Sequence, residues 1–168
     1  VTFKTSKTFT LGVAADSFND GSKDATAEAA GAVQVYSDFA ASVVVDGKIV
    51  ASLNDAIQPK FAVSTTGELT ATYVATKREL KEDYNMAKYG ASMDWNKDGV
   101  VKEWYLQSAE FSKYVVGKTA QEVLDMPTQV VEGAGYVISA EEALLTAGCT
   151  IQITSIKTVV AESVNNAR

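Results

Sequence analysis

The amino-acid sequence predicts an α+β fold, in which an antiparallel meander sheet of about five or six strands carries three to four helices packed on it. Residues 33–57 alternate apolar and polar side chains, and Asp46-Gly47 divides this run in two. Side chains alternate between the two faces of a strand, so the pattern buries one face. Asp-Gly between two such runs favours a tight hairpin, because a type I′ turn needs positive φ at both central residues. After residue 100 the apolar residues recur at helical spacing instead.

Length and composition indicate a single domain over residues 1–168. With 168 residues and 46% hydrophobic content, the chain can bury one core and is short for two. The net charge of −6 argues against a nucleic-acid partner. No run of 18 apolar residues occurs, so we expect no membrane-spanning segment.

The absence of histidine and the presence of a single cysteine narrow the chemistry. The chain has no histidine, which excludes Ser-His-Asp and Cys-His catalysis and the commonest zinc sites. Its single cysteine, Cys149, excludes an internal disulfide, and we expect an inert buried thiol. These absences favour an electron carrier or a binding module over a stand-alone enzyme.

The predicted strands follow the period of two. We expect a first strand over residues 2–13, ending at or near Gly12, and then mostly loop over residues 16–31. The hairpin pairs residues 33–45 with 49–57. Short strands at 61–63 and 69–73 flank a turn at Thr66-Gly67, and Pro59 marks a bend because it has no N–H for a ladder. In the hairpin we expect the odd-numbered residues to be buried, namely Val33, Val35, Phe39, Ala41, Val43, Val45, Ile49, Ala51, Leu53 and Ile57.

The predicted helices lie in the second half. Residues 76–86 form at most a short helical turn in a long connection, and residues 100–116 form a helix that ends at Gly117. Thr119 to Glu122 and Ser139 to Glu142 have the capping-box form, so we expect a short helix to start at each. Residues 149–154 alternate as a last strand, and residues 156–164 form an amphipathic C-terminal helix.

Residues 94–99 resemble the first half of a calcium loop. Asp94, Asn96 and Asp98 supply oxygen ligands at positions one, three and five, and Gly99 follows as the turn. Position twelve, which should be a bidentate Glu, is Tyr105. We therefore favour a helix-entry turn with no tightly held ion, and Asp94, Asn96 and Asp98 remain the ligands to name if a metal binds.

Aromatic residues are dense in the middle of the chain. This density is typical either of a packed core or of a site for a planar ligand. The residues are Tyr84, Tyr89, Trp95, Trp104, Tyr105, Phe111 and Tyr114.

Several separated segments resemble one protein family. They include residues 22–27, 43–56 with the Asp46-Gly47 turn, 77–86, 102–105 and 116–119. These segments resemble the pheromone-type extracellular lipoproteins of Gram-positive bacteria, which are related to FMN-binding domains of extracellular electron transfer. The resemblance implies export and cell-surface attachment through a lipid anchor on a cysteine upstream of Val1. A flavin transferase or a membrane redox protein would be the partner.

The resemblance also implies a cofactor, FMN, and possible attachment sites. Related domains carry FMN as a phosphoester on a threonine in a motif close to Asp-x-x-Ser/Thr-Gly-Ala-Thr. Around Thr150 only Gly148 matches, with Cys149 in place of Ala. Around Thr26, Asp20 and Ala25 match. We place Thr150 first, because strand alternation would turn its hydroxyl outward, and Thr26 second. Trp104 and Tyr105 of the aromatic cluster would then lie against the flavin ring.

Three functional hypotheses follow. The first is an extracellular flavin-binding module for electron transfer, in which the cofactor performs the chemistry. The second is a cofactor-free binding or scaffold domain on the cell surface, which the incomplete motifs favour. The third is a calcium-stabilised surface module, which rests only on residues 94–99.

Overall fold

A computed structural model describes residues 8–91, 101–133 and 135–168 and confirms the α+β class. The calcium-like residues 94–99 lie outside this range. Five antiparallel strands form the main sheet: β1 (Thr10–Asn19), β2 (Gly31–Val45), β3 (Lys48–Ile57), β4 (Lys60–Val63) and β5 (Leu69–Thr72). The helices follow β5 in the chain: α1 (Lys77–Leu80), the 3-10 helix η1 (Lys81–Tyr84), α2 (Met86–Ala91), α3 (Trp104–Tyr114), α4 (Ala120–Leu124), α5 (Glu142–Thr146) and α6 (Thr154–Asn165). Between α4 and α5, β6 (Thr128–Val130) and β7 (Val137–Ser139) pair as a small antiparallel ladder.

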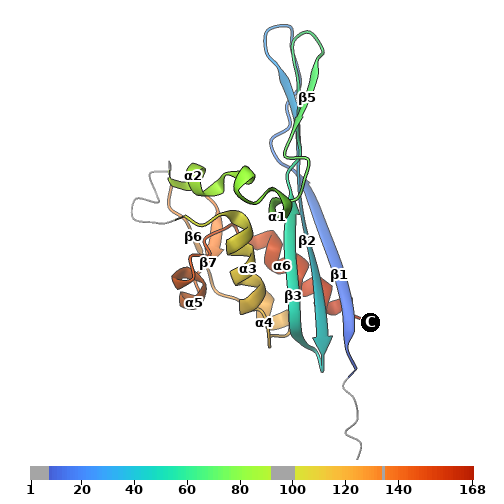
Figure 1. Cartoon of the computed structure of the whole chain (residues 1–168), viewed down its shortest axis with the longest axis vertical. Helices are drawn as coiled ribbons and strands as arrows, with labels where there is room; N and C mark the ends of the chain where they lie inside the picture. Colours follow the sequence, from blue (N-terminus) through green and yellow to red (C-terminus); the bar gives the residue numbers. More distant parts are fainter. Residues whose placement is uncertain (1–7, 92–100, 134) are drawn as a thin grey trace, which may run out of the picture.

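The long strand β2 organises the sheet. It pairs with β1 along one edge, and along the other edge it pairs with β3 and then with β4. Pro59 lies between β3 and β4, so the predicted bend is confirmed at the point where the partner strand is interrupted. The start of β2, β4 and β5 and the loop after β1 together form the narrow extension at the top of Figure 1.

The predicted hairpin turn is confirmed. Asp46 and Gly47 have φ of 52° and 74°, which are the positive values that a type I′ turn requires. The turn therefore joins β2 to β3 where the sequence indicates it.

The prediction that odd-numbered hairpin residues are buried is wrong for most positions. Val33 and Leu53 are about half exposed, whereas Ala40, Ser42 and Val44 face the helices. Val45 and Ile49 are buried as expected. The pairing register shifts between Val43 and Val44, which reverses the alternation near the turn. On the buried face, polar side chains such as those of Ser42 and Asn54 are satisfied by hydrogen bonds, so polarity did not mark the exposed face.

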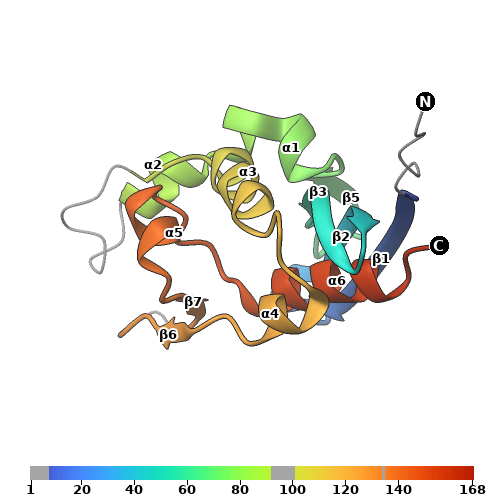
Figure 2. The same ribbon diagram turned by 90° about the horizontal axis from the view of Figure 1, so that it is seen from below.

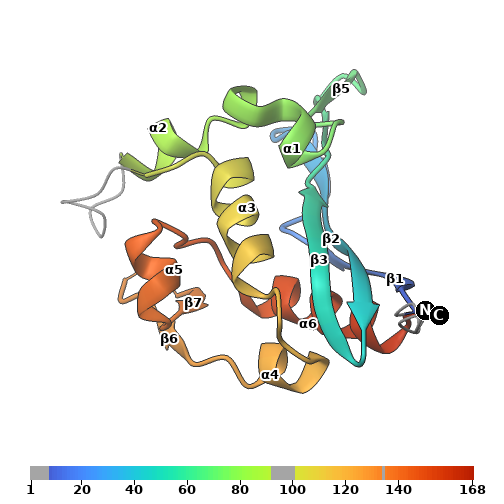
Figure 3. The ribbon, with the colours of Figure 1, turned by 60° about the horizontal axis from the view of Figure 1, so that its bottom comes forward.

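The helices cover one face of the sheet. Figure 3 shows α3 and α6 on the same side of β1–β3, and Figure 2 shows α4 and α5 on that side too. Helix α6 approaches β1 closely at Gly12, where a Cβ atom would lie 1.8 Å from the Ser163 carbonyl oxygen. The core between the layers contains Ile49, Trp104, Phe111, Leu144, Ile153, Ile156, Val159 and Val160.

Several predicted boundaries differ in the structure. Strand β1 does not end near Gly12 but continues to Asn19, because its whole length pairs with β2. Helix α3 begins at Trp104, not at residue 100. Ser139 lies in β7, so only Thr119 and Glu122 form the predicted capping box. Residues 149–153 form irregular chain in place of the predicted last strand, although Cys149, Ile151 and Ile153 are buried as that alternation implied.

The C-terminal helix is confirmed as α6, and its predicted apolar face is buried. None of the described helices combines the length and the apolar composition that a membrane span requires.

Candidate functional site

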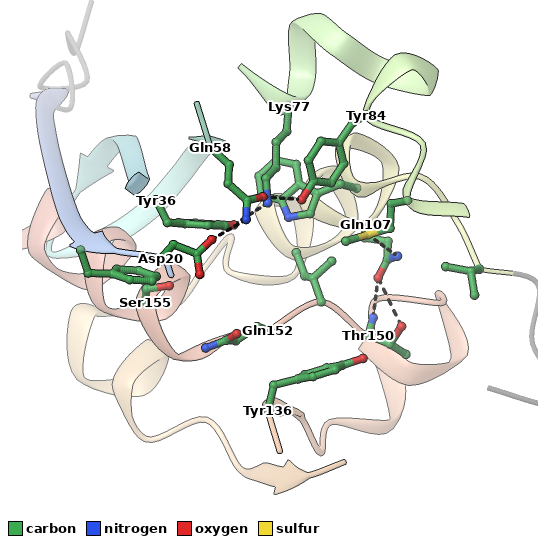
Figure 4. A pocket seen from close by; sticks show the side chains of 15 residues that line it. Asp20, Tyr36, Gln58, Lys77, Tyr84, Gln107, Tyr136, Thr150, Gln152 and Ser155 are labelled. Carbon is green, nitrogen blue, oxygen red and sulfur yellow. Dashed lines mark hydrogen bonds between the residues drawn. The ribbon is translucent and has the colours of Figure 1, made fainter. Parts of the chain in front are cut away.

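A cavity of about 250 Å³ lies between β2, the α1–η1 segment, α3 and the chain that leads into α6 (Figure 4). Aromatic side chains form much of its lining, and polar side chains are set among them. The aromatic residues are Phe18, Tyr36, Tyr84, Trp104 and Tyr136, and the polar ones include Asp20, Gln58, Lys77, Gln107, Gln152, Thr150 and Ser155.

The cavity's position depends on how α1 is held. Thr76 and Glu79 form a capping box at the start of α1, so Lys77 is the first residue of the helix. The Arg78 side chain then donates from Nε to the Asn54 carbonyl oxygen at 2.7 Å, and its backbone N–H donates to Asp55 Oδ1 at 3.1 Å. These bonds tie α1 to β3 and direct Lys77 over β2.

Lys77 is the central cation of the site. Its side chain is buried, with 2% of the residue exposed, and Nζ donates a hydrogen bond to the Tyr36 hydroxyl at 2.8 Å. Nζ also lies 4.2, 4.4 and 5.1 Å from the ring centroids of Tyr36, Tyr84 and Trp104. Burial lowers the pKa of Lys77 to about 7, against the opposing charges of Asp38, Asp20 and Asp55.

Asp38 lies on the buried face of β2 and is 1% exposed. Within the described residues neither of its carboxylate oxygens has a hydrogen-bond partner of acceptable geometry. Burial raises its pKa to about 6, although the Ser155 side chain and the Lys77 charge both act to lower it. The pKa of the neighbouring Tyr36 is also raised, mainly by burial and then by the Asp38 charge.

A chain of hydrogen bonds fixes one side of the cavity. The Tyr84 hydroxyl donates to Gln58 Oε1 at 2.8 Å, and Gln58 Nε2 donates to Asp20 Oδ2 at 2.5 Å. Gln34 Nε2 donates to the same Asp20 oxygen at 2.6 Å. In Figure 4 the Asp20 carboxylate points between Tyr36 and Gln58 toward the hollow. The phenol of Tyr36 is held flat by stacking on Phe18, with 5.2 Å between ring centroids.

Gln107 of α3 fixes the opposite side. Its Oε1 accepts a 2.7 Å hydrogen bond from the backbone N–H of Thr150, and its Nε2 donates to the Lys102 carbonyl oxygen at 2.7 Å. The Thr150 hydroxyl lies 3.4 Å from the same Oε1. Gln107 therefore positions the irregular chain around Thr150 as part of the cavity lining.

The structure brings together only some of the predicted site residues. Thr150 and Trp104 line the cavity, while Gly148 and Tyr105 do not. The Tyr105 hydroxyl donates to Glu82 at the surface, and Gly148 ends α5 with φ of 72°. Thr26 lies in the exposed loop after β1, where its hydroxyl oxygen accepts from the N–H groups of Glu28 and Ala29.

Sequence analysis missed Lys77, Tyr36, Asp38 and Gln107. One signal for Lys77 was present, because Thr76 and Glu79 have capping-box spacing and so place Lys77 at a helix start. Nothing local distinguished Asp38 or Gln107 from solvent-facing polar residues. Cys149 is buried, and burial raises the pKa of its thiol to about 12, in agreement with the predicted inert thiol.

Fold and cavity together define a small α+β domain with one open sheet face and an aromatic, internally charged pocket beside the other face. No protein-family model, curated protein or solved structure matches the chain. In the described part of the chain, no three acidic, histidine or cysteine side chains gather where they could hold a metal ion.

Proposed function

We propose that this chain is an extracellular, surface-anchored binding module whose cavity takes the flat ring of FMN for electron transfer. The observation that carries the proposal is the cavity in which Tyr36, Tyr84 and Trp104 surround Lys77. Export and the lipid anchor are taken from the family resemblance.

The size of the cavity limits how much of a flavin it encloses. A cavity of about 150 Å³ is enough for benzene, so about 250 Å³ has room for one or two fused rings. One end of the three-ring isoalloxazine would enter between the aromatic side chains, and the ribityl phosphate would remain outside. We therefore expect reversible binding of moderate affinity.

The lining residues suit a planar ring that gains negative charge. Aromatic side chains contact the faces of such a ring, and amide groups such as Gln58 and Gln152 can bond its polar edge. When bound, flavin supplies the electron-transfer chemistry. The Lys77 ammonium would stabilise negative charge on a ring held beside it.

Thr150 remains the first candidate for covalent attachment. Its half-buried hydroxyl lies on the cavity, so a phosphoester there would tether the ring within reach of the aromatic side chains. Thr26 is exposed to a modifying enzyme but does not line the cavity.

The first test is a titration of the purified protein with FMN, followed by flavin fluorescence. We expect saturable quenching that Tyr136→Leu weakens about fivefold, since an aromatic contact contributes on the order of 1 kcal/mol. Tyr105→Leu is the matched control, because Tyr105 lies outside the cavity, and it should bind like the wild type. Equal binding by both variants would place the flavin elsewhere.

Covalent attachment is tested by co-expression with a flavin transferase and peptide mass mapping. We expect FMN on Thr150 and its loss in Thr150→Val. A protein that is neither modified under these conditions nor able to bind added FMN would remove the flavin function.

The cofactor-free alternative is favoured by a separate observation. On the sheet face away from the helices, Leu11, Val13 and Leu53 are 51–63% exposed. Val13 and Leu53 also border a shallow hollow. Large exposed apolar patches commonly mark interaction surfaces. Sedimentation of the wild type and of Leu53→Asp would show whether this face binds a second copy of the chain.

A further inference from the structure

We propose that Lys77 is a covalent ligand-binding residue, whose side-chain amine condenses reversibly with a small aromatic aldehyde held in the cavity to form an imine. This activity uses the same cavity as the proposed flavin site but does not depend on flavin binding. Three features of the site carry it: the partners of the amine, its charge state and the dimensions of the cavity.

The amine of Lys77 has few hydrogen-bond partners for a buried cation. A lysine ammonium has three N–H donors, and a buried one is normally paired with a carboxylate. Here Nζ donates to the Tyr36 hydroxyl and otherwise faces aromatic rings, and none of the described carboxylates forms an ion pair with it. Lys77 lines the cavity together with the three aromatic residues that surround its amine, so the proposal requires a ligand in the cavity to contact Nζ from among these rings.

The surroundings of Lys77 leave its amine partly protonated and partly free at neutral pH. Burial favours the free amine, while the charges of Asp38, Asp20 and Asp55 and the faces of the surrounding rings favour the ammonium. The resulting pKa of about 7 leaves close to half of the amine unprotonated at neutral pH. A free amine in an apolar pocket is a nucleophile toward carbonyl carbon.

The reaction needs no oxidant or reductant. The nitrogen lone pair of Lys77 attacks the aldehyde carbon, a C–N bond forms, and the carbonyl oxygen takes a proton to give a carbinolamine. Loss of that oxygen as one water molecule, with loss of the nitrogen's proton, leaves the C=N bond. The Tyr36 hydroxyl, 2.8 Å from Nζ, is placed to relay protons in both steps. The orphan carboxyl of Asp38 stabilises the positive charge of a protonated imine.

The cavity defines the ligand class. Its volume of about 250 Å³ exceeds the roughly 150 Å³ that holds benzene and suits a single substituted aromatic ring. Aromatic side chains line it, and Asp20, Gln58 and Gln152 offer acceptors for a ring hydroxyl. A hydroxylated benzaldehyde has both features.

The experiment incubates the purified protein with 2-hydroxybenzaldehyde at pH 7, traps any imine with sodium borohydride and maps the adduct by mass spectrometry. We expect a single adduct on Lys77, formed at least about tenfold faster than on an exposed lysine. The reason is that an ordinary lysine, with pKa near 10.4, has far less than about one in a hundred amines free at this pH. Lys113, exposed on α3, is the internal reference.

Two variants keep the test decisive. Lys77→Met should abolish the fast adduct, while Lys113→Met should leave it unchanged. If Lys77→Met fails to fold, Tyr36→Phe serves in its place, because it keeps the ring and removes only the hydroxyl, and it should slow adduct formation. Adducts spread over exposed lysines, with Lys77 no faster than Lys113, would overturn the proposal. FMN titration of the same sample is independent, so retained flavin binding without trapping would reject only the imine.

Discussion

At the scale of single residues, Asp38 and Lys77 are two buried titratable groups whose hydrogen-bonding capacity is incompletely satisfied. Asp38 has no hydrogen-bond partner among the described residues. Lys77 donates a hydrogen bond to the Tyr36 hydroxyl, and its amine also lies over the rings of Tyr36, Tyr84 and Trp104. Burial moves their pKa values toward each other, to about 6 and about 7. Such displaced values in a cavity are more common at functional sites than in structural cores. Both groups therefore make stability depend on pH.

Asp38 should reduce the stability of the protein as pH rises through the mildly acid range. Between its ordinary pKa of 3.8 and the folded value of about 6, the folded protein keeps a proton that the unfolded chain has released. The free energy of unfolding therefore falls as pH rises from about 4 to about 6, by roughly 3 kcal/mol. Relative to the wild type, Asp38→Asn should gain about that amount between pH 4 and pH 7 in urea unfolding.

Two outcomes delimit this prediction. Asp24→Asn removes an exposed carboxylate in the loop after β1 and should not reproduce the gain. A constant difference between the wild type and Asp38→Asn across the pH range would show that Asp38 is not a costly buried carboxylate.

Lys77 changes the stability in the opposite direction. Between pH 7 and 10.5 the unfolded chain holds the proton that the folded protein has lost, so the free energy of unfolding rises with pH.

At the scale of secondary-structure elements, β1 and α6 approach each other closely at Gly12. Helix α6 packs over β1 and β2, and Ser163 of α6 bonds Ser42 of β2 at 2.7 Å between hydroxyl oxygens. Gly12 of β1 allows α6 to approach this closely because it has no side chain. The backbone N–H of Leu11 also bonds the carbonyl oxygen of Arg168, which fixes the chain beyond α6 to β1.

Gly12→Ala should destabilise the protein strongly. The new methyl group would lie 1.8 Å from the Ser163 carbonyl oxygen and 2.6 Å from the Ala167 nitrogen, so α6 would have to move. We expect a loss of about 3 kcal/mol or more in chemical unfolding. Gly21→Ala is the control: it has φ of 87° but no atom within 4 Å, and it should cost only about 1–2 kcal/mol. Equal losses would mean that the close approach of α6 to β1 at Gly12 costs no more than the backbone strain at Gly21.

At the scale of the whole molecule, the described helices cover one face of the sheet. The helices and the cavity lie beside the face that carries Ala40, Val44 and Ala56. The opposite face of β1–β3 carries Leu11, Val13 and Leu53, which remain largely exposed. The chain therefore has two distinct apolar surfaces, one buried in its own core and one open.

Paired substitutions in β3 test this division. Ile49→Ala should cost about 2–5 kcal/mol, because Ile49 is 1% exposed and its removal leaves a cavity. Leu53→Ala should cost less than about 1 kcal/mol, because Leu53 is 51% exposed. Thermal or urea unfolding measures both. A large loss for Leu53→Ala that depends on protein concentration would indicate that the open face is covered by a second copy of the chain.

Patterns that depend on neighbouring residues predicted the structure well. The Asp46-Gly47 hairpin, the bend at Pro59, the turn at Thr66-Gly67, the Thr119 capping box and helix α6 all form as expected. Of the predicted cofactor residues, Trp104 and Thr150 line the cavity, whereas Gly148, Tyr105 and Thr26 do not.

By itself, the sequence determined the α+β class, the hairpin of β2 and β3 and most turns, because φ preferences and side-chain periodicity act within a few residues. It did not determine the full strand order, since β4 pairs with β2 and not with β3 as in the predicted meander. Only the tertiary structure decided which sheet face is buried. Both faces carry apolar residues, and the choice depends on whether α3 and α6 can satisfy Ser42 and Asn54. It also decided the cavity, because Tyr36, Lys77, Gln107 and Thr150 come from separate elements. Their burial, and hence their charge, exists only after those elements have packed together.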